Sequence, residues 1–133
     1  MGQDQNYGGL GITAHEDLTA STKLYCFVKS DRDSSAGLLG VKLAGVGDHP
    51  LGVLIINGAS GAQVAIAKNR TSKIKYGAVV HAGDHLIVGA LGVAVTATVS
   101  TSCDSPGIAT MDGVSGDIGE ILFDSIEKEY SGL

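Results

Sequence analysis

Apolar residues along this chain come in short runs, which are separated by polar segments that contain glycine. The clearest run, residues 51–56, is followed by Asn57-Gly58, a dipeptide that strongly favours a tight turn between antiparallel strands. No long segment keeps the apolar period of about 3.6 residues of a helix without a glycine interrupting it. We therefore expect strands over residues 24–28, 38–46, 51–56, 62–67, 78–81, 85–88, 93–99, 107–111 and 118–123.

Many short strands joined by glycine turns are typical of an all-β fold, here a single compact β-barrel or sandwich. Residues 21–124 form the predicted barrel domain, with a polar loop at 30–35, and residues 125–133 form a short C-terminal tail. Residues 1–20 are polar and glycine-rich and follow neither period, so they predict an extended N-terminal arm. The predicted core residues are Leu24, Val28, Val53, Ile55, Val64, Ile66, Leu86, Val93, Val95, Ile121 and Phe123.

One segment of the chain recurs. Residues 52–61 and 107–116 match at four positions, three of them glycines, and both read as a strand followed by a turn. Duplication is one interpretation, and similar turns that use similar residues are the other. A second similarity joins 47–49 and 83–85, which are both Gly-Asp-His. The predicted turn-forming glycines are Gly58, Gly61, Gly83, Gly113 and Gly116.

Charge argues against a nucleic-acid partner. The chain has 9 Lys and Arg against 14 Asp and Glu, a net charge of −5, whereas binding along a phosphate backbone needs clustered positive charge. The densest basic stretch has a spacing near two, which is typical of the solvated side of a strand or loop. It consists of Lys68, Arg70, Lys73 and Lys75.

Membrane insertion and secretion are also not expected. The first residues lack the basic and apolar regions of a signal peptide, and the longest apolar stretch, 78–99, is interrupted by His, Asp and glycines. Cys26 and Cys103 lie far apart without a CxxC spacing. We therefore expect synthesis in the cytoplasm and free, buried thiols.

Three histidines define the alternative interpretation, a small metal- or ligand-binding domain or enzyme that uses His49, His81 and His85. A His-x3-His spacing brings two imidazoles together on a helix, but the expected strands and the glycine between them separate these two. The interpretation that the pattern favours is a Gly-Asp turn in which each His covers the end of a strand. The GxSxG and GxGxxG motifs are absent, so we expect no enzyme activity, no metal and no cofactor.

Six segments follow one another in an order and with glycine positions that we know from one family. They are 48–54 (DHPLGVL), 61–66 (GAQVAI), 75–86 (KYGAVVHAGDHL), 92–96 (GVAVT), 107–109 (GIA) and 116–123 (GDIGEILF). Over about residues 22–123 the chain thus resembles the small capsid decoration (cement) proteins of tailed bacteriophages. It departs from them at 100–105, where the family has an alanine-rich loop with carboxylates.

The resemblance implies a β-tulip-like barrel that forms a homotrimer. It implies a virion protein without a reaction or cofactor, located on the outer surface of the head. There it would bind the major capsid protein at three-fold and quasi-three-fold positions. A polar arm can add a strand to another chain's sheet, so we expect Tyr7, Leu10 and Ile12 to contact the capsid or a neighbouring protomer. A protomer of another β-rich shell or fibre is a third interpretation.

Overall fold

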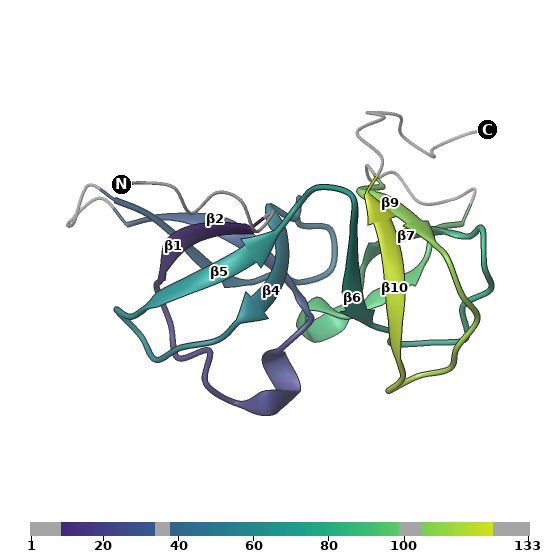
Figure 1. Cartoon of the computed structure of the whole chain (residues 1–133), viewed down its shortest axis with the longest axis horizontal. Coiled ribbons are helices and arrows are strands. Elements are labelled where there is room, and N and C mark those ends of the chain that lie inside the picture. Colours follow the sequence, from purple (N-terminus) through teal and green to yellow (C-terminus); the bar gives the residue numbers. More distant parts are fainter. Residues whose placement is uncertain (1–8, 34–37, 99–104, 124–133) are drawn as a thin grey trace.

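The chain folds into two lobes that follow one another in sequence (Figure 1). The computed structural model describes residues 9–33, 38–98 and 105–123. The first lobe contains β1 (Gly9–Ala14), β2 (Phe27–Asp33), β3 (Leu38–Leu43), β4 (Gly52–Ile56) and β5 (Gln63–Ala67). The second contains β6 (Thr71–Lys75), β7 (His85–Val88), β8 (Ala94–Thr96), β9 (Gly107–Ala109) and β10 (Ile118–Phe123).

The two lobes have the same strand order. The first is a closed barrel, β1-β3-β2-β4-β5, in which β5 pairs again with β1. The second is a sheet with the order β6-β10-β9-β7-β8. Its two edges meet at a parallel bridge between Tyr76 and Ala94, as β1 and β3 meet in parallel in the barrel. Around this circle of strands, each strand of the second sheet corresponds to one of the first barrel: β6 to β1, β8 to β3, β7 to β2, β9 to β4 and β10 to β5.

The strand registers agree pair by pair, which makes the second sheet a repeat of the first barrel. Residues 52–61 and 107–116, whose similarity is visible in the sequence, occupy equivalent places in β4 and β9 and the turns that follow. The two Gly-Asp-His segments do not, because one precedes β4 and the other leads into β7. Four residue pairs of the first barrel each have an equivalent pair in the second sheet. Thr13↔Gln63 corresponds to Lys75↔Ile118, Ala14↔Val41 to Tyr76↔Ala94, Val28↔Leu43 to Leu86↔Thr96, and Val28↔Gly52 to Leu86↔Gly107.

The described residues of the protein form two hydrophobic cores. The first lies within the first barrel, and the second lies in the second lobe but includes residues of the first barrel. Phe27, Ala44 and Val53 belong to the first barrel but pack in the core of the second sheet, so the two lobes form one folded unit. The first core consists of Ala14, Leu18, Val28, Val41, Leu54, Val64 and Ile66. The second adds Ile74, Tyr76, Val80, Leu86, Val88, Ala94, Ala109 and Ile121 to the three shared residues.

Tyr76 fills the second core where the first barrel has Ala14. Its side chain is fully buried, and its hydroxyl donates a hydrogen bond to the carbonyl of Met111 over 2.8 Å. The ring occupies the space above Gly119, where a Cβ atom would overlap it, and a Cβ at Gly113 would come within 2.6 Å of it. Gly119 is equivalent to Val64. The first barrel therefore combines the small Ala14 with the larger Val64, whereas the second sheet combines the large Tyr76 with the small Gly119.

The all-β class is confirmed, but some elements differ from the sequence prediction. Gly9–Ala14 lies in the predicted arm and is instead a barrel strand that pairs on both edges. The end of β2 extends into the predicted loop at 30–35 because β3 pairs with it. The sequence pattern predicts no strand at Thr71–Lys75, which forms β6. Its lysines and the preceding Lys68 and Arg70 agree with the solvated strand or loop expected for the basic stretch. Residues 78–81 form only a bridge, between Val80 and Gly113.

The exchange around Tyr76 predicts a specific coupling. Gly119→Ala pushes a methyl group into a buried ring, and we expect it to lower the free energy of unfolding by about 2 kcal/mol. Tyr76→Ala leaves a cavity and costs about 4 kcal/mol. In the double variant the added methyl meets no ring, so the two losses will not add. Urea unfolding of the four proteins measures this, and strictly additive losses would contradict the packing described.

Candidate interaction surfaces

Three turns in the described chain share one arrangement, a glycine followed by an aspartate. In residues 45–48, 81–84 and 114–117 the aspartate N–H donates to the carbonyl three residues earlier, over 3.0, 2.9 and 3.0 Å. The glycines have positive φ angles of 86° at Gly47 and 94° at Gly83 and Gly116. This combination is typical of a type II turn, which favours glycine at its third residue. Residues 59–62 form a similar turn with Gly61, but alanine follows it.

The aspartates complete these turns with their side chains. Asp48 accepts the N–H of Gly45 over 2.8 Å, and Asp84 accepts that of His81 over 2.9 Å. Asp117 does the same for Val114 over 2.9 Å. The bond from Gly45, and then Lys29 at 3.1 Å, hold the pKa of Asp48 below its ordinary value. The Gly-Asp pattern therefore has a structural role in each of these turns.

Gly58 and Gly113, the other two predicted turn glycines, have a different task. Neither has a positive φ. Their carbonyls accept the N–H groups of Leu18 and Val80, two equivalent contacts of 2.9 Å each. A Cβ at Gly58 would lie 3.1 Å from Val64 Cγ1, and one at Gly113 would press on the ring of Tyr76. These glycines permit close approach of neighbouring segments.

Tyr25 stands in the first barrel where the second sheet has Gly83. Both residues donate a backbone hydrogen bond to equivalent carbonyls, of Leu54 and Ala109, and Tyr25 keeps a positive φ of 65° although it is not glycine. The ammonium group of Lys73 lies 5.5 Å from its ring centroid, a cation–π contact that joins the lobes. Cys26 follows as a buried free thiol, as predicted, and burial raises its pKa. Cys103 lies outside the described residues.

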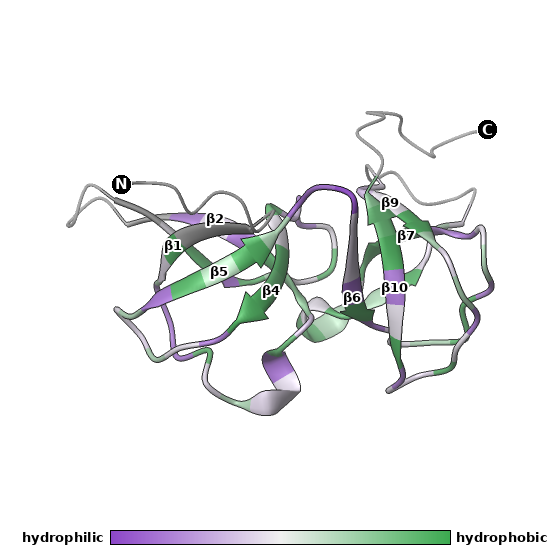
Figure 2. Cartoon of the chain, in the orientation of Figure 1, coloured by the Kyte–Doolittle hydropathy of each residue, from purple (hydrophilic) through white to green (hydrophobic). Residues whose placement is uncertain are grey.

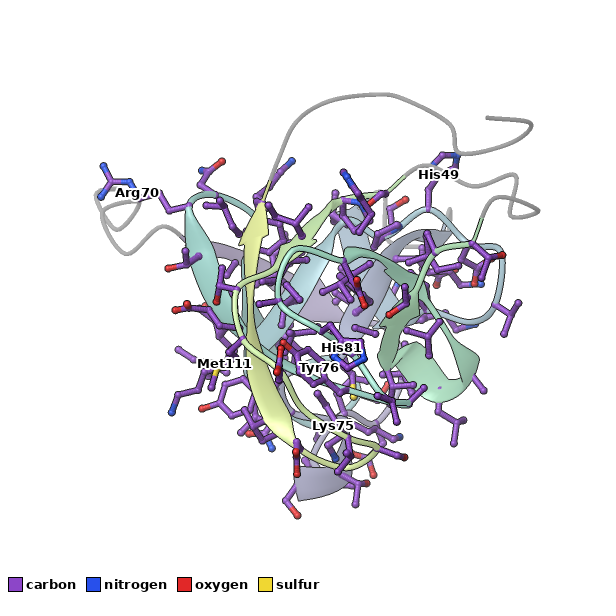
Figure 3. The ribbon with its side chains drawn as sticks, turned by 90° about the vertical axis from the view of Figure 1, so that its right-hand side faces the viewer. His49, Arg70, Lys75, Tyr76, His81 and Met111 are labelled. Carbon is purple, nitrogen blue, oxygen red and sulfur yellow. The ribbon has the colours of Figure 1, made fainter. Side chains whose placement is uncertain are left out.

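The three histidines of the alternative interpretation do not form a cluster. His49 and His81 are exposed and lie well apart in Figure 3, and His85 begins β7. Within residues 9–33, 38–98 and 105–123, no group of three or more His, Cys, Asp or Glu side chains is placed to hold a metal ion. No helix of the described structure has the length and hydropathy to cross a membrane.

Two of the three predicted arm contacts fall within β1. Leu10 pairs with Ile66, and Ile12 pairs with Val64 and is partly buried against the first core. The prediction of an arm is thus wrong for this segment, because the alternation that marks a strand is hidden by glycines at positions 9 and 11. Tyr7 lies outside the described residues.

The structure also joins the basic stretch seen in the sequence to apolar side chains of a distant strand. Lys68, Arg70 and Lys73 are exposed on the connection into β6 and on that strand. Figure 2 shows this connection in purple, as a hydrophilic segment between the lobes. Ile118 and Leu122 of the neighbouring β10 are 43% and 40% exposed. The pairing of β6 with β10, which places Lys73 on one face with Ile118 and Leu122, is a long-range contact that composition does not reveal.

The described structure is that of an all-β protein made of two tandem five-stranded units. Among solved structures it is similar to the N base of the head fibre protein gp8.5 of bacteriophage phi29, with a TM-score of 0.70. The match covers 91% of this chain and 97% of that chain, at 18% sequence identity, and therefore shows a shared fold. No protein-family model matches the sequence, and a comparison with curated proteins finds no match.

The turn at residues 45–48 provides a matched pair of substitutions. Gly47 has a positive φ and open space around it, whereas Gly45 lacks a positive φ and would place a Cβ no closer than 3.6 Å to its neighbours. We expect Gly47→Ala to lower the free energy of unfolding by about 1 kcal/mol, and Gly45→Ala to change it by less than about 0.5 kcal/mol. Chemical denaturation compares the two, and equal losses would show that the turn does not require a left-handed residue.

Proposed function

We propose that this chain is a structural protein of a tailed-phage virion that binds the outer surface of the head. The observation that carries the proposal is the fold shared with the phi29 head fibre base over nearly the whole of both chains. The resemblance of its ordered glycine segments to capsid decoration proteins supports the same location. The order of the sequence motifs and the three-dimensional fold thus both support the proposal of a protein attached to a phage head.

The partner we propose is the major capsid protein, bound by a homotrimer at three-fold and quasi-three-fold positions. The decoration-protein resemblance supports this arrangement. A trimer that engages three equivalent capsid subunits gains avidity, so that a modest contact per chain suffices for stable attachment. In this role the protein strengthens contacts between capsid subunits and catalyses no reaction.

The N-terminal segment enters the proposal in a reduced form. Since β1 closes the first barrel, a deletion of residues 2–20 would remove a strand and unfold the protein. Residues 2–7, which include Tyr7, precede the strand and are the part that we propose to contact the capsid or a neighbouring protomer. Ile12 supports the barrel instead.

Co-sedimentation tests the proposed function. Heads of the phage that encodes this sequence, prepared without the protein, are mixed with purified protein and pelleted. We expect saturable binding, with a copy number per head that matches the three-fold and quasi-three-fold positions. Heads of an unrelated phage serve as the control. Absence of the protein from the pellet would refute the proposal.

Deletion of residues 2–7 tests the N-terminal contact separately. We expect the shortened protein to keep its circular dichroism spectrum and unfolding midpoint, because β1 is intact, and to bind heads at least about tenfold more weakly. Light scattering reports in the same samples whether the trimer persists. Binding equal to that of the full chain would exclude residues 2–7 from the contact.

A further inference from the structure

The outer face of β6 and β10 differs from the same face of the first barrel. Thr71, Lys73 and Lys75 of β6 stand opposite Leu122, Glu120 and Ile118 of β10. The equivalent pairs in the first barrel join Gly9, Gly11 and Thr13 to Ala67, Ala65 and Gln63. One copy of the repeat is therefore smooth and uncharged on this face, whereas the other carries long cationic and aliphatic side chains.

Positive charge is concentrated on this face and on the connection that leads into β6. Four of the chain's 9 Lys and Arg lie within residues 68–75, which contain no Asp or Glu, although the whole chain has a net charge of −5. Among the described residues, none of the four takes part in an ion pair. Glu120, the one carboxylate on the face, accepts a hydrogen bond from the Thr110 hydroxyl over 2.6 Å. We call Lys68, Arg70, Lys73, Lys75, Ile118 and Leu122 the cationic face.

The cations differ in how firmly the fold holds them. Lys75 donates to the carbonyl of Thr22 over 2.8 Å, and Lys73 stacks on Tyr25, so these two are fixed at the lobe junction. Lys68 and Arg70 are exposed on the connection between β5 and β6, and Figure 3 shows Arg70 extending away from the ribbon. Arg70 has a φ of 62°, a conformation that glycine adopts more easily. The turn itself gains nothing from an arginine at this position.

We propose that the cationic face is the surface through which this protein docks on an acidic protein surface of the phage head. This inference rests on the proposed function and identifies the contact that performs it. Charge complementarity supports the choice of partner, because like charges across an interface are strongly unfavourable and opposite charges guide docking. The exposed Ile118 and Leu122 add apolar area on the strand beside the cations, which suits a protein partner.

A nucleic acid fits the same face less well. Surfaces that bind DNA are strongly positive and polar, and the remainder of this chain is acidic enough to repel phosphates. The cationic face is also a short strip, with aliphatic side chains on the neighbouring strand. A protein surface with grouped carboxylates is therefore the partner of matching chemistry.

Head binding by charge variants tests the inference. Lys68→Glu reverses an exposed charge on the cationic face, and Lys42→Glu makes the same change on β3 of the first barrel. Arg70→Gly removes a cation and also relieves the left-handed backbone. We expect Lys68→Glu to weaken head binding about tenfold and Arg70→Gly about threefold, with Lys42→Glu within about twofold of wild type. Raising the salt concentration should weaken wild-type binding more than that of Lys68→Glu.

The outcomes separate the two proposals. Urea unfolding first establishes that each variant is folded, and we expect Arg70→Gly to be at least as stable as wild type. If wild type binds heads and Lys68→Glu and Arg70→Gly bind equally well, the cationic face is not the contact, whereas the proposed function stands. If wild type itself fails to bind, both are wrong. Binding of wild type to duplex DNA that Lys68→Glu abolishes, with head binding unchanged, would also overturn the inference.

Discussion

The buried ring of Tyr76 is the contact on which the second lobe depends. Its backbone N–H donates to the Asp117 carbonyl over 2.8 Å, and its own carbonyl accepts the N–H of Gly116 over 2.8 Å, so the residue ties β6 to the turn before β10. Its bridge to Ala94 closes the circle of strands. The ring then fills a core in which small residues replace the larger ones of the first barrel. Backbone pairing and side-chain volume thus meet at one position, and neither Gly113 nor Gly119 tolerates a side chain while the ring is there.

Around this contact the two copies of the repeat have kept one architecture and diverged in their outward faces. The inward positions exchange volume between neighbours and preserve total packing, which is how a core accepts several substitutions at once. The outward positions follow no such constraint. Phe27 and Val53 of the first barrel are buried in the second core. Their equivalents in the second sheet, His85 and Ile108, are only partly buried. The lobe interface therefore arises from asymmetry between two similar units.

The sequence contains most of this fold but hides the parts that depend on pairing. β4, β5, β7 and β10 are apolar enough to be recognised alone, and the similarity of 52–61 to 107–116 indicates the duplication. β1 and β6 lack that signal, because glycines in one and lysines in the other replace the apolar alternation, and hydrogen bonds from neighbouring strands define them instead. Tyr76 was not among the predicted core residues, since its burial requires glycines far away in sequence. The sequence shows the four cations of the cationic face but not their apolar neighbours Ile118 and Leu122, which the pairing of β6 with β10 places beside them.

Duplication gives a physical reason to look for function on the face that differs. A solvent-exposed strand needs only solubility, which the small and neutral residues on β1 and β5 provide. Lysine and arginine side chains lose conformational freedom when they are held in place, and an arginine in a left-handed conformation adds strain. Stability alone does not favour a cation at the exposed positions of Lys68 and Arg70, whereas Lys73 and Lys75 also contact Tyr25 and Thr22 of the first lobe. Recognition of an oppositely charged surface favours cations at these exposed positions, because their charges then contribute to the interface that forms when the chain meets its partner.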